Sequence, residues 1–246
     1  MAARLERVIV VGASSGIGEA IVQRLVADGA EVAAVARRKE LLDALVAAHP
    51  GKVRAYAHDV EETDDAPALW QKIGTELGDV DTLVYASGVM PTIEEGEYSF
   101  EKDRQMIAVN LLGAMAWMNL AAAKFQAQKR GTIVGISSIA GERGRRGNPA
   151  YCTSKAAMTT YLESLRNRTA RYGVNVVTIK PGFVKTAMVG GRENLLWIIP
   201  PEKAARRSLA IARKGSSASG FVPRRWWLVA FIVRMLPSFI FRRLNF

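Results

Sequence analysis

Short apolar runs rich in valine and isoleucine alternate along this chain with longer segments of helical periodicity. This alternation is typical of a parallel sheet that helices cover on both faces. The pattern predicts strands near residues 7–11, 31–36, 53–58, 80–85, 131–136 and 174–179, and a last strand ending near 222. It predicts helices near residues 19–28, 39–48, 67–77, 100–126 and 151–172. We therefore expect an α/β fold with a doubly wound sheet, in which ligands bind outside the carboxyl ends of the strands.

Glycines mark the ends of several predicted helices. Glycine is favoured just past a helix because it readily adopts a left-handed backbone. The chain places glycine at such points at Gly29, Gly78, Gly131 and Gly173. These positions strengthen the helix assignments.

The composition is that of an ordinary globular protein. The chain has 246 residues, 49% of them hydrophobic, and we find no linker, repeat or low-complexity tract. A single cysteine, Cys152, cannot form an intramolecular disulfide, so we expect a cytoplasmic protein in which Cys152 is a packed small residue rather than a reactive thiol. His49 and His58 lack a metal-ligand spacing, and we expect no metal site.

A glycine-rich turn follows the first predicted strand and leads into the first helix. Its glycines are Gly12, Gly16 and Gly18, with Ser14, Ser15 and Ile17 between them. The spacing differs from G-x-G-x-x-G, but glycines here still allow the backbone to approach a pyrophosphate, and free N–H groups at a helix start favour negative charge. We expect a dinucleotide site.

The end of the second strand predicts which dinucleotide binds. An NAD-preferring protein usually carries an acid there for the ribose 2′-hydroxyl, whereas this chain has Arg37 and Arg38 followed by Lys39. Guanidinium groups suit a 2′-phosphate, so we expect NADP(H) rather than NAD. The alternative is that these charges only solvate a helix start. Asp59, at the end of the third strand, either accepts a hydrogen bond from the adenine amino group or caps a helix.

A tyrosine and a lysine stand four residues apart on the helix predicted near 151–172. Residues i and i+4 share a helix face, so Lys155 can favour the phenolate of Tyr151. The ordinary tyrosine pKa near 10 is too high for efficient acid–base work at neutral pH. This Y-x-x-x-K spacing is weak on its own because both residue types are common on solvated helix faces.

In combination, these motifs resemble the short-chain dehydrogenase/reductase family over about residues 5–190. The resemblance rests on the glycine turn, on Asp59 with Val60, and on the segments 137–141 and 181–186, together with Asn110, Ser138, Tyr151 and Lys155. It implies a seven-stranded, mainly parallel Rossmann-type sheet in a single domain, hydride transfer between nicotinamide and an alcohol or carbonyl, and a homodimer or homotetramer.

The resemblance also implies a role for each site residue. Tyr151 is the general acid in reduction, Lys155 lowers its pKa and binds the nicotinamide ribose, Ser138 polarises the substrate carbonyl, and Asn110 holds a water that leads protons to the lysine. The residues expected to bind the cofactor are Gly12, Ser14, Ser15, Gly16, Ile17, Gly18, Arg37, Arg38, Asp59, Val60, Gly88, Asn110, Tyr151, Lys155, Pro181, Gly182, Val184 and Thr186.

Two departures from the family pattern concern the cofactor end. Tyr85, Ala86, Ser87 and Gly88 stand where the family usually has Asn-Asn-Ala-Gly, and Val11 stands where a threonine often precedes the first glycine. We expect Gly88 still to allow close cofactor approach and Tyr85 to pack in a way that the family does not predict.

The segment expected to form a lid over the substrate, about residues 186–203, is unusually apolar. It carries Met188, Leu195, Leu196, Trp197, Ile198 and Ile199. Such a lid suits a lipophilic ketone, because burial of hydrocarbon drives its binding. The alternative is a lid whose apolar face packs on its own protein.

A basic and apolar tail, residues 223–246, follows the predicted catalytic domain, residues 1–222. The net charge of the chain is +11, and after Glu202 there are ten Lys or Arg and no Asp or Glu. The basic residues are interleaved with bulky aliphatic ones, which argues against a nucleic-acid partner. Residues 226–233 are too few to span a bilayer, but tryptophans flanked by arginines suit an interfacial helix. We expect peripheral membrane attachment, with a neighbouring subunit or the substrate entrance as the alternative surface.

Three arginines, Arg143, Arg145 and Arg146, precede the tyrosine, and we expect a solvated loop there rather than a site for an anionic substrate group. The sequence as a whole predicts an NADPH-dependent carbonyl reductase acting on a hydrophobic, lipid-like substrate. The alternative is a non-catalytic NADP-binding sensor or interaction protein, against which the presence of Ser138, Tyr151 and Lys155 argues.

Overall fold

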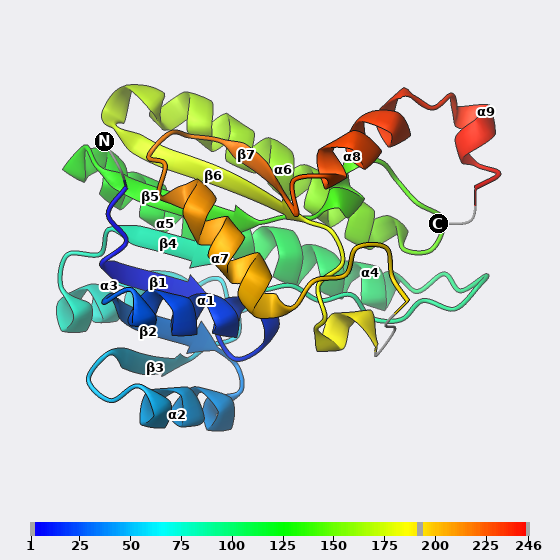
Figure 1. Cartoon of the computed structure of the whole chain (residues 1–246). Coiled ribbons are helices and arrows are strands. Elements are labelled where there is room, and N and C mark those ends of the chain that lie inside the picture. Colours follow the sequence, from blue (N-terminus) through cyan, green and yellow to red (C-terminus); the bar gives the residue numbers. More distant parts are fainter. Residues whose placement is uncertain (1–2, 191–193, 245–246) are drawn as a thin grey trace.

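The computed structural model describes residues 3–190 and 194–244. A seven-stranded parallel sheet with the strand order β3-β2-β1-β4-β5-β6-β7 forms its centre (Figure 1). The strands are β1 (Arg7–Val11), β2 (Glu31–Ala36), β3 (Val53–Ala57), β4 (Thr82–Tyr85), β5 (Gly131–Ile136), β6 (Val174–Pro181) and β7 (Ser219–Val222). The doubly wound α/β fold expected from the sequence is thus confirmed, and every strand pair in the sheet is parallel.

Helices pack on both faces of this sheet. The helices of the structure are α1 (Gly16–Ala27), α2 (Lys39–Ala48), α3 (Ala66–Leu77), α4 (Phe100–Ile107), α5 (Gly113–Gln128), α6 (Pro149–Thr169), α7 (Pro201–Ala212), α8 (Trp226–Met235) and α9 (Ser238–Phe241), of which α8 and α9 do not cover a face of the sheet. Alternate residues of a strand point to opposite faces. On β1, Val8 and Val10 join the core under α1, α2 and α7, whereas Ile9 and Val11 join the core under α3, α5 and α6.

The predicted boundaries agree closely with the structure, with two informative differences. The predicted helix near 100–126 is present as one helical stretch, Phe100–Gln128, but it is not α-helical throughout, because Ala108–Leu112 form a π-helical turn between α4 and α5. After α5 the left-handed position is taken by Lys129, with φ 55°, and Gly131 already belongs to β5. The prediction that Gly131 ends a helix was therefore wrong, whereas Gly29, Gly78 and Gly173 do follow helical segments with positive φ.

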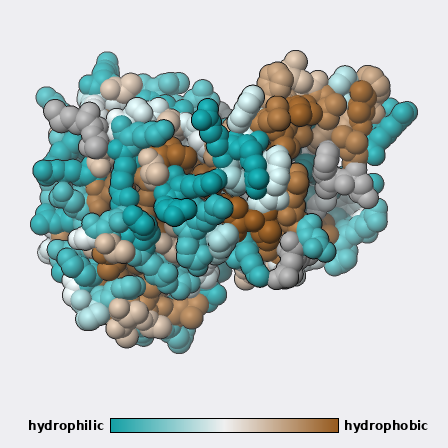
Figure 2. Space-filling model, viewed as in Figure 1, coloured by the Kyte–Doolittle hydropathy of each residue, from teal (hydrophilic) through white to brown (hydrophobic). Residues whose placement is uncertain are grey.

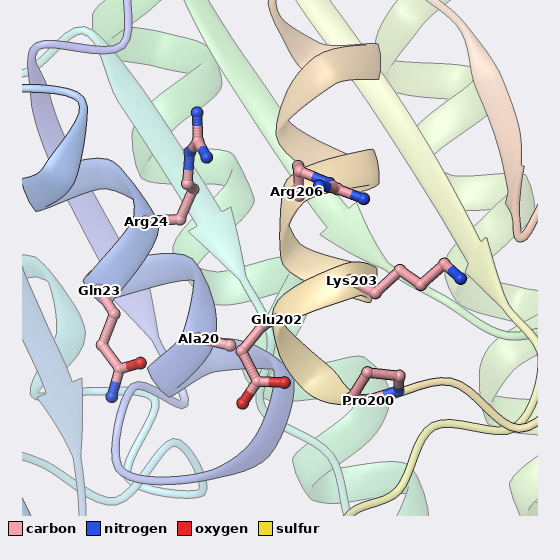
Figure 3. A pocket seen from close by; sticks show the side chains of 7 residues that line it. All are labelled: Ala20, Gln23, Arg24, Pro200, Glu202, Lys203 and Arg206. Carbon is pink, nitrogen blue, oxygen red and sulfur yellow. The ribbon is translucent and has the colours of Figure 1, made fainter.

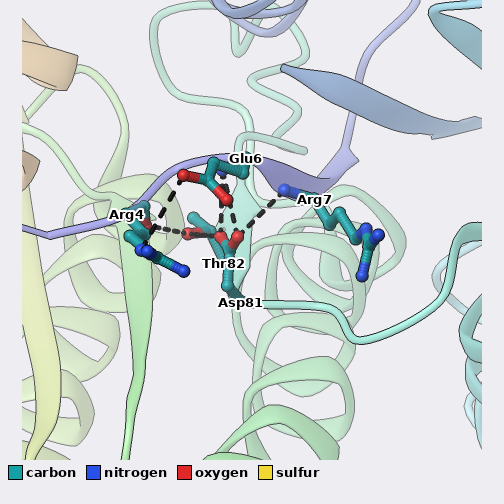
Figure 4. Close-up of polar contacts among 5 residues, drawn as sticks. All are labelled: Arg4, Glu6, Arg7, Asp81 and Thr82. Carbon is teal, nitrogen blue, oxygen red and sulfur yellow. Dashed lines mark hydrogen bonds and ion pairs between the residues drawn. The ribbon is translucent and has the colours of Figure 1, made fainter.

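The amino-terminal edge of the sheet is held by a partly buried carboxylate. Asp81, just before β4, accepts hydrogen bonds from the backbone N–H of Glu6 (3.0 Å) and of Arg7 (3.0 Å) and from the hydroxyl of Thr82 (2.7 Å) (Figure 4). The Thr82 hydroxyl also lies 3.2 Å from the carbonyl oxygen of Arg4. Burial raises the pKa of Asp81 in spite of these donors. This network joins β1 to β4 at the edge opposite to the one where ligands bind in such sheets.

Polar and glycine-rich loops gather at the carboxyl edge of the sheet. The strand order reverses at β1, whose neighbours are β2 on one side and β4 on the other. Connections from β1 and β4 therefore leave in opposite directions and open a crevice between them, which is the usual ligand position in doubly wound sheets. The carboxyl-terminal helices α8 and α9 lie beyond the same edge (Figure 1).

Candidate active site

The turn between β1 and α1 is packed so closely that side chains are excluded from its glycines. A Cβ atom at Gly18 would lie 2.0 Å from the carbonyl oxygen of Gly12, and one at Gly12 would lie 2.4 Å from the backbone nitrogen of Ser87. Gly12 and Gly16 also have positive φ values of 87° and 59°. The turn therefore needs glycine to bring the start of α1 close to the loop after β4, with the N-terminus of this helix at the crevice.

Two arginines at the end of β2 lie beside this turn. Arg38 donates hydrogen bonds to the hydroxyls of Ser14 (3.0 Å) and Ser15 (2.7 Å). Arg37 forms an ion pair of 3.4 Å with Asp59, whose other oxygen accepts the backbone N–H of Glu61 at 3.1 Å. A guanidinium, two hydroxyls and a helix N-terminus thus converge on one spot, which suits a phosphate.

A cleft of about 540 Å³ runs along this edge of the sheet. Of the residues predicted to bind cofactor, ten line it: Gly12, Ser14, Ser15, Gly16, Ile17, Arg37, Arg38, Val60, Gly88 and Thr186. The others, which do not line it, are Gly18, Asp59, Asn110, Tyr151, Lys155, Pro181, Gly182 and Val184. Further lining residues, which were not among those predicted to bind the cofactor, are Ala36, His58, Ala86, Ser87, Val89, Met90, Pro91, Gln105, Val109, Ala187 and Met188.

Ser138 and Tyr151 come from two elements that are packed tightly together. Ser138 begins a 3₁₀ turn, Ile139–Glu142 (η2), and its hydroxyl accepts the backbone N–H of Ala140 at 3.1 Å. A Cβ at Gly141 would lie 2.7 Å from the backbone of α6, so only glycine allows η2 to contact that helix so closely. Ser137 adds a hydrogen bond of 2.9 Å to the carbonyl of Lys155. These contacts place Ser138 opposite the first turns of α6.

Tyr151 is almost fully buried in the first turn of α6. Asn148 caps this helix, and its side-chain oxygen accepts the backbone N–H of Tyr151 at 3.2 Å. Burial raises the pKa of Tyr151, while a hydrogen bond with Ser138 and the charge of Arg145 act in the opposite direction. The phenol lies 3.8 Å from the sulfur of Met188. Ser138 and Tyr151, thirteen residues apart in the sequence, therefore lie close enough for the serine to act on the pKa of the phenol.

Lys155 lies one helical turn beyond the tyrosine on the same face of α6. Its ammonium is 5.9 Å from the centre of the Tyr151 ring and donates a hydrogen bond of 3.0 Å to the carbonyl of Ile136, at the end of β5. Burial lowers the pKa of Lys155 to about 8, because the charged form loses hydration. A Cβ at Gly88 would lie 3.3 Å from this ammonium, so the lysine lies just below the wall of the cleft.

Asn110 sits in the π-helical turn and holds the loop after β4. Its amide oxygen accepts the N–H of Val89 at 2.7 Å, and its amide nitrogen donates to the carbonyl of Val89 at 3.0 Å and to the hydroxyl of Ser154 at 3.1 Å. Its expected role with a proton-carrying water stays a prediction. The side chain positions Val89, next to Gly88, against α6.

Tyr85 takes part in the same arrangement. Its side chain is fully buried, and its hydroxyl donates a hydrogen bond of 2.6 Å to the carbonyl of Val109 within the π-helical turn. A Cβ at Gly113 would lie 2.8 Å from this hydroxyl. Tyr85 thus secures the turn that carries Asn110, a contact that the alternation of polar and apolar residues does not reveal.

The loop after β6 approaches the glycine turn from the other side. Thr186 lines the cleft, and a Cβ at Gly16 would lie 3.0 Å from its methyl group. Pro181 ends β6, while Gly182 passes so close to Trp226 that a Cβ there would lie 1.9 Å from the indole nitrogen. Val184 is buried and pairs with Ile199. Part of the expected lid, residues 191–193, lies outside the described residues.

The arginines before Tyr151 differ from the expected solvated loop. Arg143 donates a hydrogen bond of 2.6 Å to the carbonyl of Val233 in α8 and lies over the ring of Phe241. Arg146 forms an ion pair of 3.6 Å with Glu95. The solvated-loop prediction was wrong for Arg143, because a distant part of the chain folds back onto it.

Within residues 3–190 and 194–244, no group of three or more His, Cys, Asp or Glu side chains is placed to hold a metal. Cys152 is buried and unbridged. A second hollow of about 470 Å³ lies between α1 and α7 and is lined by Ala20, Gln23, Arg24, Pro200, Glu202, Lys203 and Arg206 (Figure 3). It shares none of the residues that line the cleft beside Gly88.

Comparison with known sequences gives consistent results. The family model described as short chain dehydrogenase matches residues 6–195. An oxidoreductase of Myxococcus xanthus, whose name describes it as uncharacterized, is 36% identical over 183 residues, which is 73% of this chain and 72% of the relative. Carbonyl reductase family member 4 of Xenopus tropicalis is 31% identical over 208 residues, covering 81% of this chain and 88% of that protein.

Solved structures share the fold over nearly the whole chain. A short-chain dehydrogenase from Streptomyces avermitilis superimposes with a TM-score of 0.82 at 26% identity and covers 93% of both chains. ElxO, solved with NADP bound, superimposes with a TM-score of 0.79 at 21% identity over 90% of this chain and 98% of its own. The matched family model, the relatives and the fold agree: this chain belongs to the short-chain dehydrogenase family and is an oxidoreductase of that family.

Proposed function

We propose that this chain catalyses the NADPH-dependent reduction of a carbonyl group, or the reverse oxidation of an alcohol, on a hydrophobic substrate. The proposal is carried by the buried Lys155, whose ammonium lies 5.9 Å from the Tyr151 ring and beside Gly88 at the cleft, with Ser138 close to the same phenol. At this spacing, the phenol can donate a proton to a carbonyl oxygen while the hydroxyl donates a hydrogen bond to the same oxygen. The amine can then return a proton to the phenol.

Each residue has a role that follows from its contacts. When bound, NADPH supplies a hydride to the carbonyl carbon. Tyr151 holds the proton for the carbonyl oxygen, and Ser138, close to the same phenol, donates a second hydrogen bond to that oxygen. Lys155 has a pKa lowered by burial to about 8, so it can exchange protons near neutral pH. Met188, against the phenol, lies where the substrate approaches.

The preference for NADP rests on the groups around Arg38. This guanidinium, with the hydroxyls of Ser14 and Ser15, lines the cleft beside the start of α1 and fits a 2′-phosphate. Asp59 is engaged by Arg37 and by the backbone, and it does not line the cleft. The structural neighbour ElxO was solved with NADP bound, so a protein of this fold can hold the proposed cofactor.

The proposed substrate is hydrophobic because apolar side chains surround the phenol. Tyr151 belongs to a cluster with Met106, Ala140, Ala150 and Cys152, against which Val89, Met90, Ile93 and Met188 pack. Such a wall offers a carbonyl compound hydrocarbon contact and few polar partners. A lipid-like ketone fits this environment better than a polar sugar.

The chain divides into a catalytic domain and a basic, apolar tail in this proposal. We propose that residues 1–222 form the catalytic domain of a cytoplasmic homodimer or homotetramer, and that residues 223–246 attach it peripherally to a membrane. The exposed apolar side chains of the tail support the second assignment.

The decisive experiment follows NADPH absorbance against a panel of lipophilic ketones in detergent. Turnover with at least one ketone, lost in Tyr151→Phe, is expected. No turnover with any ketone would favour a non-catalytic NADP-binding protein, and turnover that survives in Tyr151→Phe would refute the assigned mechanism. A parallel series with NADH tests Arg38, since an equal or higher rate with NADH would show that NADP preference is wrong.

A further inference from the structure

The large apolar side chains that remain exposed are concentrated at the carboxyl-terminal end. Of the 13 exposed large hydrophobic residues among those the structure describes, eight lie in or beside α8 and α9. These eight, which we call the tail patch, are Trp227, Leu228, Phe231, Ile232, Met235, Phe239, Ile240 and Leu244. Figure 2 shows a hydrophobic area on the part of the surface formed by α8 and α9. A contiguous apolar patch of this kind marks a binding surface.

The opposite side of α8 is fixed to the substrate end of the catalytic domain. Trp226 is buried and contacts the rings of Phe183 and Trp197 at centroid distances of 5.7 and 5.5 Å. The guanidinium of Arg225 lies 4.4 Å from the centre of the Trp197 ring. The first turn of α8 is thus packed on the loop after β6 and on the expected lid.

The far end of α8 is fixed to the turn that begins at Ser138. Glu142, whose side chain is only 2% exposed, forms ion pairs with Lys180 at 2.8 Å and with Arg234 of α8. The next residue, Arg143, donates to the carbonyls of Val233 and Leu236. Carbonyls at a helix C-terminus lack partners within the helix and favour a cation. These contacts make α8 and the Ser138 turn one packed unit.

Arginines flank the tail patch, and acidic residues are absent from this part of the sequence. Arg224 and Arg225 precede α8, Arg242 and Arg243 follow α9, and all four are exposed. No Asp or Glu follows Glu202 in the chain. Two copies of this surface facing each other would bring like charges together, whereas anionic lipid headgroups would neutralise them. The charge therefore favours a membrane over a second copy of the chain.

The length of the helix determines how it can meet a bilayer. α8 has ten residues, which corresponds to about 15 Å, half of the ~30 Å hydrocarbon core. One stretch of the described residues, Phe100–Gln128, is long and apolar enough to span a bilayer, but half of its apolar 18-residue segment is buried inside the protein, as in a core helix. Side chains such as Trp227 and Phe231 suit shallow insertion between headgroups.

We propose that the tail patch docks on an anionic lipid bilayer, and that Glu142 and Arg143 hold it to the Ser138 turn so that the substrate end of the cleft faces the lipid. A hydrophobic ketone then passes from the bilayer to Tyr151 without crossing water. The docking surface stands on its own evidence, and the path of the ketone rests on the proposed function.

The docking test uses the full chain and needs neither ketone nor NADPH. Co-flotation is measured with vesicles of phosphatidylcholine, with and without phosphatidylglycerol. We expect binding to the anionic vesicles and at least tenfold weaker binding for Phe231→Ser. The matched control, Leu41→Ser, changes an exposed leucine on the distant helix α2 and should bind like the wild type. Thermal melting of both variants checks that they remain folded.

The electrostatic part has its own pair of variants. A basic residue at an anionic surface strengthens binding about fivefold, so Arg242→Gln/Arg243→Gln should weaken binding by about 25-fold. Lys52→Gln/Lys214→Gln makes the same charge change on exposed lysines outside the tail and should have a smaller effect. Equal losses in the two variants would show attraction by net charge alone and would overturn the docking surface.

Three further results would overturn the proposal. The first is a wild-type protein that does not float with anionic vesicles. The second is Leu41→Ser weakening binding as much as Phe231→Ser. The third is light scattering that shows Phe231→Ser dissociating an oligomer while vesicle binding is unchanged, which would assign the patch to a subunit contact. Failure of every ketone to react would instead refute the proposed function and leave the vesicle result to decide the docking surface.

The path of the ketone is tested by comparing one water-soluble and one vesicle-dissolved ketone. Phe231→Ser should retain kcat and KM for the soluble ketone and show at least a tenfold higher KM for the vesicle-dissolved one. Arg143→Gln should still bind vesicles yet lose the advantage with the vesicle-dissolved ketone, because the patch is no longer held to the Ser138 turn. Unchanged kinetics in both variants with the vesicle-dissolved ketone would refute the path.

Discussion

Replacement of Lys155 by methionine should change how the stability of the cofactor-free protein depends on pH. An unfolded lysine keeps its proton up to about pH 10.5, whereas burial lowers the pKa of Lys155 in the folded chain to about 8. Below pH 8 the folded protein therefore carries the full cost of a buried ammonium. Between these two values unfolding takes up a proton, so the free energy of unfolding of the wild type rises with pH.

The expected magnitude follows from the two pKa values. One pH unit corresponds to about 1.36 kcal/mol, so the wild type should gain about 3 kcal/mol relative to Lys155→Met between pH 7.5 and 10.5. For a protein of this size, that is a relative increase of about 6–12 °C in Tm. Methionine matches the unbranched lysine stem and carries no charge. Other titrating groups are common to both proteins and largely cancel in the difference.

The assay is urea unfolding of both proteins, followed by circular dichroism at several pH values across this window. Lys203→Met, which removes an exposed lysine from α7, serves as the control and should run parallel to the wild type. Parallel curves for the wild type and Lys155→Met would refute the reasoning, because they would show that the ammonium is hydrated in the folded protein. The activity of Lys155→Met is expected to be lost at every pH.

Three other substitutions test particular contacts. Tyr85→Phe removes the hydroxyl that donates to the carbonyl of Val109, which should cost about 1 kcal/mol, and a Tm within 1 °C of the wild type in calorimetry would contradict this. Arg38→Gln should raise the KM for NADPH by about 10–100-fold with little change for NADH in steady-state kinetics, and an equal rise for both would assign the arginine to the shared part of the dinucleotide. Gly18→Ala places a Cβ against the carbonyl oxygen of Gly12 and should abolish cooperative unfolding or cofactor binding. A wild-type unfolding transition together with wild-type affinity for the cofactor would show that the turn can shift.

The sequence was sufficient for the fold because the relevant signals are local. Valine-rich runs such as residues 31–36 have the length and composition of buried parallel strands, and β2 has these same bounds. The glycine turn after β1 and the four-residue spacing of Tyr151 and Lys155 are also local, and the structure places the turn at the cleft and the pair on one face of α6.

The tertiary structure decided which distant residues meet. The sequence separation between Arg143 and Val233 is 90 residues, and that between Tyr85 and Val109 is 24. Nothing in the hydrophobic periodicity indicates such pairs, because periodicity reports which face of an element is buried and not what it is buried against. For this reason Arg143 was predicted to be solvated, whereas the folded chain uses it to hold α8 beside the Ser138 turn.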